Sequence, residues 1–268
     1  MTTILAVGAI AAFAADVTGR SITHLVLNPA LFASQPWALL TTIFPHGGPL
    51  HLLFNLYWIW PFGCAIESRL GSARYAVLAA ACAAVSMGSE VLVGNTAIGL
   101  SGVVYGLVFF AYYRGKHDPH FRGLVPDQLR NFFIAWFFIC IALTLMNVMR
   151  IGNFAHGMGA VAGWAFGHRK RWVAPALVAA LVGGLFARPL YAPYDRGNAA
   201  FQEGVRLLQD NRDLEAAELY QRFVVDHPRV AEGWWNLSVA RDRLGDRERA
   251  REARQRAIEL DPGVATNR

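Results

Sequence analysis

Long apolar runs joined by short polar connections fill residues 1–190, whereas apolar and polar positions recur with a helical period after residue 198. A membrane-spanning helix needs about 20 mostly apolar residues, or about 17 at the short end of the range. The first region therefore predicts seven spanning helices, near residues 3–18, 50–66, 75–93, 99–113, 131–149, 153–168 and 172–188.

Some of these apolar segments have a second interpretation. The N-terminal run is apolar like a signal peptide, but it lacks a basic start, so we expect an uncleaved first helix. Segment 172–188 contains Pro175, Gly183 and Gly184 and either crosses the membrane or lies on its surface; its lack of charge before Arg188 favours crossing. We expect the long 19–49 connection, with apolar patches that include Leu31 and Phe32, to lie along the membrane surface.

Composition supports the membrane prediction and divides the chain in two. The sequence is 54% apolar and 16% charged, whereas a typical soluble domain is about 25% charged. Twelve of the 25 Lys and Arg but only five of the 19 Asp and Glu lie in residues 1–190, so the net charge of +6 arises in the apolar region. We interpret this charge as a determinant of membrane topology and predict no nucleic-acid partner.

The position of the basic residues predicts the orientation. If the N-terminus is cytoplasmic, the cytoplasmic connections hold Arg69, Arg74, Arg114, Lys116, Arg122, Arg130, Arg169, Lys170 and Arg171. The opposite side holds only Arg20, Arg150 and Arg188. Cytoplasmic loops carry the excess of Lys and Arg, so we predict a cytoplasmic N-terminus. The C-terminal region is then extracytoplasmic if segment 172–188 crosses, and cytoplasmic if it does not.

The residues that bind metals most often show no metal-binding pattern. Cys64, Cys82 and Cys140 fall in apolar segments without ligand spacing, and we expect them to be small buried side chains. His46, His51 and His156 do not have the spacing of a metalloprotease. The sequence therefore predicts no metal site and no cofactor.

A serine stands at the start of the fourth apolar segment, in the sequence Gly99-Leu100-Ser101-Gly102. Polar groups are costly within a bilayer, so they are candidates for function. Small residues here could instead serve close helix packing, and a related motif carries the nucleophile of α/β-hydrolases. The second alternative requires alternating strands and helices, which the sequence lacks. Tyr105 is four residues from Ser101 and shares its helix face.

The sixth apolar segment presents His156 one turn before Gly159, Gly163 and Gly167. Glycines four residues apart form a flat stripe that lets two helices approach closely. We expect this stripe to dock on the Gly102 face of the Ser101 helix and to bring the imidazole to the hydroxyl. The alternative is a histidine that only stabilises helix packing.

His51 and Asn55, four residues apart, share one face at the start of the second apolar segment. Alone they suit interfacial polar positions. Together with Ser101 and His156 they supply what acyl transfer requires, which is a nucleophile, a base and hydrogen-bond donors for an oxyanion. The sequence therefore favours a serine hydrolase that acts in the membrane.

Residues Trp37 to Arg171 resemble the rhomboid family of intramembrane serine proteases. The resemblance rests on PHGGPLHLLFNLYWIW at 45–60, ESRLGS at 67–72, GLSGVVYG at 99–106 and AHGMGAVAG at 155–163. One departure is Ala38 after Trp37, where family members often have Arg; it bears on the first external loop and not on the chemistry.

The resemblance implies a six-helix core with a water-filled cavity and a Ser101–His156 catalytic dyad. Tyr105 would pack beneath the imidazole, and the Ser101 N–H, Asn55 and His51 would form the oxyanion site. Gly99, Gly102, Gly159 and Gly163 would support it. Family substrates are transmembrane or membrane-anchored proteins, cut within or near their membrane helix, and no cofactor is used.

The C-terminal region aligns with itself at a shift of 34 residues, with Ala216 against Ala250 and Pro228 against Pro262. It resembles the tetratricopeptide repeat (TPR), a helix-turn-helix unit of that length, with Asn211 where glycine is usual. Such repeats bind peptides or proteins on a concave face, so we expect a protein partner or, alternatively, a stabilising cap.

These observations predict an all-α protein. Residues 1–190 would form a polytopic rhomboid-like helical bundle, a six-helix core with a seventh helix, in the lipid bilayer of a bacterial inner membrane. Residues 191–197 would be a linker and 198–268 a small domain of TPR-like helices. The competing functions are a membrane scaffold without catalysis and a transporter, although no inverted repeat is evident.

Overall fold

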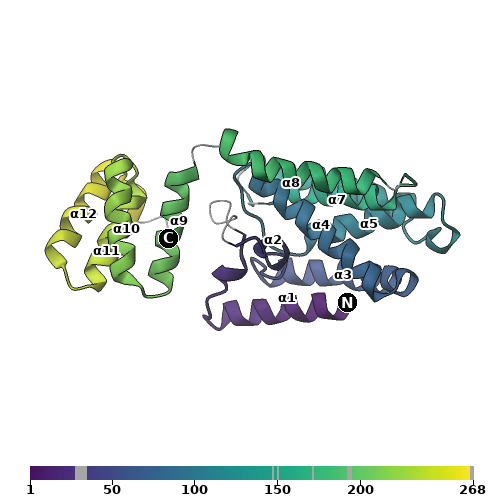
Figure 1. The fold of residues 1–268 in the computed structure, drawn as a ribbon. Helices are drawn as coiled ribbons and strands as arrows, with labels where there is room; N and C mark the ends of the chain where they lie inside the picture. Colours follow the sequence, from purple (N-terminus) through teal and green to yellow (C-terminus); the bar gives the residue numbers. More distant parts are fainter. Residues whose placement is uncertain (28–34, 147, 150, 171, 192–194, 266–268) are drawn as a thin grey trace. The chain divides into compact units, whose positions relative to one another are not determined.

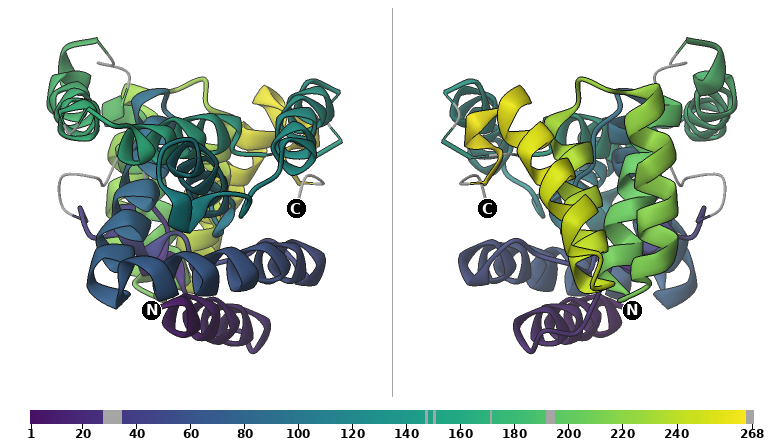
Figure 2. Two further views of the ribbon diagram at one scale, coloured as in Figure 1. Left: turned by 90° about the vertical axis from the view of Figure 1, so that its right-hand side faces the viewer. Right: turned by 90° about the vertical axis from the view of Figure 1, so that its left-hand side faces the viewer.

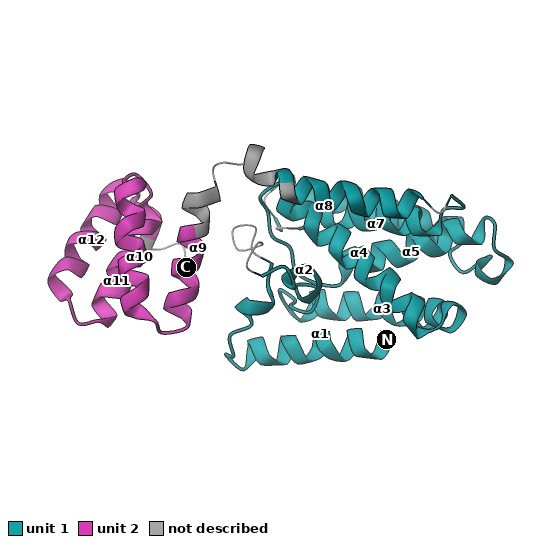
Figure 3. Ribbon diagram, viewed as in Figure 1, with its two compact units in different colours: residues 1–188 teal, residues 189–268 magenta. Residues whose placement is uncertain are grey.

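The computed structural model describes residues 1–268 except 28–34, 147, 150, 171, 192–194 and 266–268. Over these residues all regular structure is helical, which confirms the predicted class. The chain divides into two compact units, Met1–Arg188 and Pro189–Arg268 (Figure 3). Leu31, Phe32, Arg150 and Arg171, together with residues 192–194 of the predicted linker, lie outside the described residues.

Over the described residues, an α-helix lies at each of the seven predicted spans, the last of them extending just past the first unit, and a short α-helix lies in the 19–49 connection (Figure 1). In chain order they are α1 Thr2–Val17, the short α2 Ala38–Thr41, α3 Pro49–Leu70, α4 Ser72–Leu92, α5 Ser101–Gly115, α6 Asp127–Leu145, α7 Asn153–Gly167 and α8 Val173–Tyr191. Among the described residues, α4 and α6 are long and apolar enough to cross a membrane by length and composition alone.

Local sequence explains where the central helices begin and end. Pro49 occupies the first position of α3, where its missing N–H costs no hydrogen bond. Gly71, with a φ of +79°, ends α3 and begins α4, so the two helices join in one sharp turn. Gly99, with a φ of +102°, precedes Ser101 and turns the chain into α5.

Helix α5 packs against both α4 and α7, and the three lie side by side in Figures 1 and 2. Its apolar residues are almost entirely buried, among them Val103, Leu107, Val108 and Ala111. Small residues of α4 face it, including Cys82 and Ala83. Helix α5 is therefore the centre of the first unit, and its first residue is Ser101.

Glycines bring α5 and α7 to backbone contact. A Cβ on Gly159 would overlap the Gly102 carbonyl oxygen, and one on Gly163 would overlap the Gly106 carbonyl oxygen. From the α5 side, a Cβ on Gly102 would lie 3.1 Å from the Ala155 carbonyl oxygen. The glycine stripe recognised in the sequence thus faces the Ser101 helix.

Exposure differs strongly between helices. Most of α4 is buried within the unit, whereas α6 exposes Phe138, Ile139 and other apolar side chains, as expected of a surface in contact with lipid.

The three cysteines were predicted to be buried. Cys82 and Cys140 are buried, but Cys64 is exposed, so the prediction was wrong for Cys64. Cys64 is not among the α3 positions that face the core, which include Phe62, Gly63 and Ile66. Ala38 is fully buried in α2.

The second unit consists of two helical hairpins, α9 Asp195–Gln209 with α10 Asp213–Asp226, and α11 Ala231–Arg243 with α12 Arg247–Leu260. A 3₁₀ turn, Pro262–Ala265, follows. The end of the first helix and both ends of the second helix of each hairpin recur 34 residues later, as Gln209 and Arg243 show, whereas α11 begins 36 residues after α9.

Equivalent positions of the two hairpins also share a backbone conformation. The turn residues Asn211 and Gly245, 34 positions apart, have φ values of +56° and +82°. Asparagine is one of the few non-glycine residues that adopt this left-handed conformation readily, which explains its place in the first copy. Ala216 and Ala250, also 34 apart, are both buried.

Candidate active site

Ser101 and His156 meet where α5 and α7 begin. His156 Nε2 lies 2.8 Å from Ser101 Oγ, a hydrogen bond between residues 55 positions apart in the sequence. Ser101 is the first residue of α5, so its hydroxyl lies at the N-terminal end of the helix. His156 is buried with 6% of its surface exposed, and its Nδ1 has no hydrogen-bond partner among the described residues.

Tyr105 supports the imidazole from one face. The rings of Tyr105 and His156 stack, with centroids 4.8 Å apart and an interplanar angle of 18°. The Tyr105 hydroxyl donates to the Phe133 carbonyl oxygen of α6 at 3.1 Å, and the Phe133 ring meets Tyr105 edge to face. The phenol is thus fixed at both its ring and its hydroxyl, and it limits how far the imidazole can rotate.

His51 and Asn55 approach from α3. Gly47 N–H donates to His51 Nδ1 at 3.3 Å, so the ring proton is on Nε2, which is left as a donor. A Cβ on Gly99 would lie 2.9 Å from His51 Nε2, and therefore glycine is needed there for space as well as for its φ. Asn55 is buried and donates one N–H to the His51 carbonyl oxygen at 3.0 Å, which leaves its second N–H.

Sequence analysis did not assign a role to His46, which the structure places beside His51 with ring centroids 4.9 Å apart. His46 Nδ1 lies 2.8 Å from the Phe44 carbonyl oxygen, and its Nε2 accepts from the Leu100 N–H at 3.4 Å. Burial lowers the pKa of His46 to about 4, so the ring is neutral and able to accept. The sequence feature that could have identified His46 as a site residue is its position in the loop before α3, five residues ahead of His51.

Glu90 is the second residue that sequence analysis left without a role. It lies near the end of α4 with 2% of its surface exposed, and its Oε1 accepts from the Ala155 N–H at 2.9 Å. Ala155 immediately precedes His156, so a carboxylate distant in sequence touches the start of the histidine helix. Its presence in an apolar segment was the only sequence signal.

Comparison with known proteins gives one consistent result. Residues 33–172 match the Rhomboid domain family. The chain is similar to rhomboid protease GlpG of Enterobacter sp. (strain 638), 33% identical over 141 residues, which are 50% of this chain and 51% of that protein. It is similar to the protein of the same name from Salmonella choleraesuis, 38% identical over 109 residues, 38% of this chain and 40% of that protein.

A third relative, rhomboid protease GlpG of Yersinia pseudotuberculosis, is 32% identical over 129 residues, 46% of each chain. The chain spans about half the length, or less, of these curated relatives. The matched residues include α3 to α7 and hence every side chain of the site described above. Since this match covers more than half of its 268 residues, the chain belongs to the rhomboid family.

Proposed function

We propose that this protein is an intramembrane serine endopeptidase that uses a Ser101–His156 dyad. The observation that carries the proposal is the 2.8 Å hydrogen bond between His156 Nε2 and Ser101 Oγ. A serine hydroxyl becomes an effective nucleophile when an adjacent base within this range can take its proton. Family membership favours peptide bonds as the target.

In the proposed reaction, Ser101 Oγ attacks the scissile carbonyl carbon while its proton moves to His156 Nε2. The tetrahedral intermediate collapses when the imidazolium returns that proton to the leaving amine, which leaves an acyl-enzyme. Water then attacks the ester with His156 again as base, and the carboxylic product departs. The stacked Tyr105 ring holds the imidazole in the orientation that both transfers require.

The negative charge of the intermediate would be met by three donors. The first N–H groups of a helix have no partner within it, so the Ser101 N–H is available. The Asn55 amide has one N–H beyond that given to the His51 carbonyl, and His51 presents its Nε2–H beside Gly99. Donors fixed before reaction stabilise an oxyanion without further reorganisation.

The substrates we propose are transmembrane or membrane-anchored proteins, cut within or near their membrane helix. We place the protein in a bacterial inner membrane as a multi-pass protein with a cytoplasmic N-terminus. The proposed orientation rests on nine basic residues in one set of connections against three in the other. Helix α8 would then place the C-terminal unit on the extracytoplasmic side.

A fluorophosphonate probe tests the proposal. Wild-type protein in proteoliposomes should form a covalent adduct that peptide mass mapping assigns to Ser101, because the probe phosphonylates activated serines with loss of fluoride. His156→Ala should label at a rate on the order of 10³-fold lower, since the base is lost. Exposed Ser68 is an internal control and should stay unmodified. A wild-type protein that forms no adduct at Ser101 would favour the scaffold alternative.

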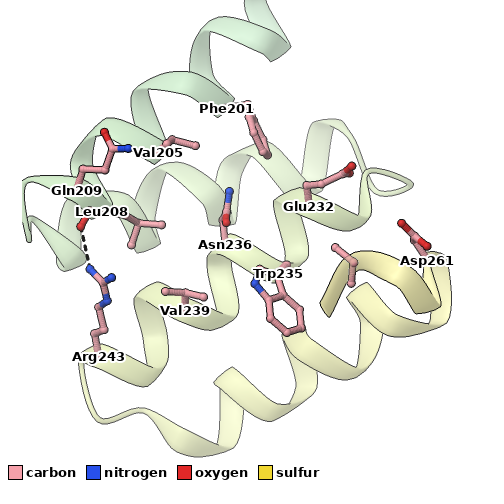
Figure 4. Close-up of a pocket in the computed structure, with 11 residues that line it drawn as sticks. Phe201, Val205, Leu208, Gln209, Glu232, Trp235, Asn236, Val239, Arg243 and Asp261 are labelled. Atoms are coloured by element: carbon pink, nitrogen blue, oxygen red, sulfur yellow. Dashed lines mark hydrogen bonds between the residues drawn. The ribbon is translucent and has the colours of Figure 1, made fainter. Parts of the chain in front are cut away.

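We also propose that the second unit is TPR-like and captures a peptide segment of a substrate or partner. The proposal is supported by the 34-residue recurrence and by a hollow of about 440 Å³ between α9 and α11 (Figure 4). Apolar side chains of both helices line it, including Phe201, Val205 and Val239. Glu232 and Asp261 lie at one end and Arg243 at the other, which suits an extended peptide with a basic residue at one end.

Charge placed in this hollow should impair capture selectively. Val205→Arg should slow cleavage of native membrane substrates, identified by their new N-termini in cells, while cleavage of a short model transmembrane helix stays unchanged. Val225→Arg is the matched control, because Val225 is 69% exposed and lies outside the hollow. An equal effect of the two variants, or an equal loss on both kinds of substrate, would indicate a stabilising role only.

A further inference from the structure

Glu90 is a buried carboxylate in an apolar helix, a costly arrangement in a membrane protein. No cationic side chain forms an ion pair with it among the described residues. Its hydrogen bond is with the Ala155 N–H, which donates to Oε1 at 2.9 Å, and the Phe154 N–H and the Asn95 side-chain amide are further donors close to the carboxyl group. The carboxylate therefore serves as an acceptor for the segment that begins α7.

The two backbone donors are those that a helix cap normally satisfies. Gly152 is the N-cap residue of α7, which makes Phe154 and Ala155 the second and third residues of the helix. A side-chain oxygen at the N-cap usually accepts from these two N–H groups, but glycine has no side chain to offer. Glu90 supplies the oxygen from α4 instead, and an acceptor in this place suits the positive end of the helix dipole.

The close fit at Gly152 explains why the cap comes from another helix. A Cβ on Gly152 would lie 2.6 Å from the Ala97 Cβ and 3.1 Å from Glu90 Oε1. A serine or aspartate at this N-cap would therefore displace both Ala97 and the carboxylate. The absence of a side chain at Gly152 leaves the space that the Glu90 carboxyl group occupies.

This cap lies immediately before the proposed base. His156 follows Ala155, and its own N–H is the first to bond along the helix, to the Gly152 carbonyl oxygen at 3.1 Å. Glu90 does not bond the imidazole, because Nδ1 has no partner among the described residues. Any effect on the imidazole must therefore pass through the backbone of the first helical turn.

We infer that Glu90 is a positioning residue that fixes, as an N-cap supplied from α4, the turn of α7 that carries His156 toward Ser101. The inference rests on the proposed Ser101–His156 dyad. Small misplacements of a reacting group have large effects on rate, on the order of 10²-fold for about 1 Å. The carboxylate thus contributes to catalysis without touching the substrate.

The test compares Glu90→Ala, Glu90→Gln and Ser89→Ala in proteoliposomes with a model transmembrane substrate. Ser89 is the matched control, a buried neighbour on α4 whose hydroxyl bonds only within that helix, to the Ser86 carbonyl oxygen. We expect Glu90→Ala to lower kcat and the rate of fluorophosphonate labelling by about 10- to 100-fold with KM within about twofold. Glu90→Gln keeps an acceptor oxygen and should restore most of the loss, and Ser89→Ala should match wild type.

Three results would overturn the inference. The first is a kcat of Glu90→Ala within about twofold of wild type, and the second is a loss in Glu90→Gln as large as in Glu90→Ala. The third is a loss that follows only the folded fraction, measured by thermal unfolding of each variant. Ser101→Ala in the same assay distinguishes failure of the proposed dyad from failure of the inference about Glu90. If Ser101→Ala remains active, the Ser101–His156 dyad is wrong. If Ser101→Ala is inactive and Glu90→Ala is unimpaired, only the role of Glu90 is wrong.

Discussion

Ser101→Ala is expected to lower turnover of a model transmembrane substrate below detection while the protein stays folded. Removal of the nucleophile from a serine protease typically lowers kcat by on the order of 10⁶-fold. The fold should persist because the Ser101 hydroxyl has one hydrogen-bond partner among the described residues, His156 Nε2, and alanine is favourable in a helix. Purified variant in proteoliposomes, assayed for cleavage by mass spectrometry with thermal unfolding in parallel, checks both halves.

The same assay can show that Ser101 and His156 act as one unit. If they do, Ser101→Ala combined with His156→Ala should be no slower than either single variant, because the second change removes nothing that remains in use. Asn55→Ala should be impaired by about 100- to 1,000-fold and not completely, as for one lost oxyanion donor. A double variant whose loss in cleavage rate equals the product of the two single losses would contradict the dyad.

The second large effect is expected at the α5–α7 contact, where Gly163→Ala should destabilise the protein by about 3 kcal/mol, at the upper end of the usual cost of overpacking. A methyl group there would overlap the Gly106 carbonyl oxygen, which is backbone and cannot rotate away. The helices must separate, and the separation also moves His156 from Ser101. Thermal unfolding in detergent should show a lower Tm, and fluorophosphonate labelling should slow at temperatures where the variant remains folded.

Gly183→Ala is the control for this prediction. Gly183 lies in α8, and a Cβ there has no neighbouring atom within 4 Å. Alanine is favoured over glycine in a helix by about 1 kcal/mol, so this variant should be as stable as wild type or more so. A Gly163→Ala protein with unchanged Tm and labelling would show that α5 and α7 are not packed by backbone contact.

Ser101→Ala and Gly163→Ala both affect the contact between α5 and α7, the first through its chemistry and the second through its packing. The chemistry needs an imidazole and a hydroxyl within hydrogen-bonding distance, and the glycines determine whether their helices come close enough. Gly159 and Gly163 meet Gly102 and Gly106 at successive turns, so the helix pair is in contact along two turns beyond the site. The glycine variants should therefore lose both stability and activity, whereas Ser101→Ala should lose activity and remain folded.

The sequence by itself determined the elements and the main chemical groups. The apolar runs located the seven helices, because about 20 apolar residues suit a lipid-spanning helix. Helical spacing placed Tyr105 on the face of Ser101, and the four-residue recurrence of Gly159 and Gly163 indicated a close helix contact. These features depend on residues within a few turns of one another, which is why they could be predicted without coordinates.

Only the tertiary structure revealed the contacts that Glu90 and His46 make with residues distant in the chain. Glu90 meets the Ala155 N–H across 65 positions, and His46 meets Leu100 across 54. The exposure of Cys64 likewise depends on which face of α3 packs against the core. Local periodicity gives the faces of each helix but not the rotation and offset at which two helices pack, and a hydrogen bond forms only within about 3 Å. For that reason Ser101, His156 and Tyr105 of the candidate site could be predicted from the sequence, whereas the contacts of Glu90 and His46 could not.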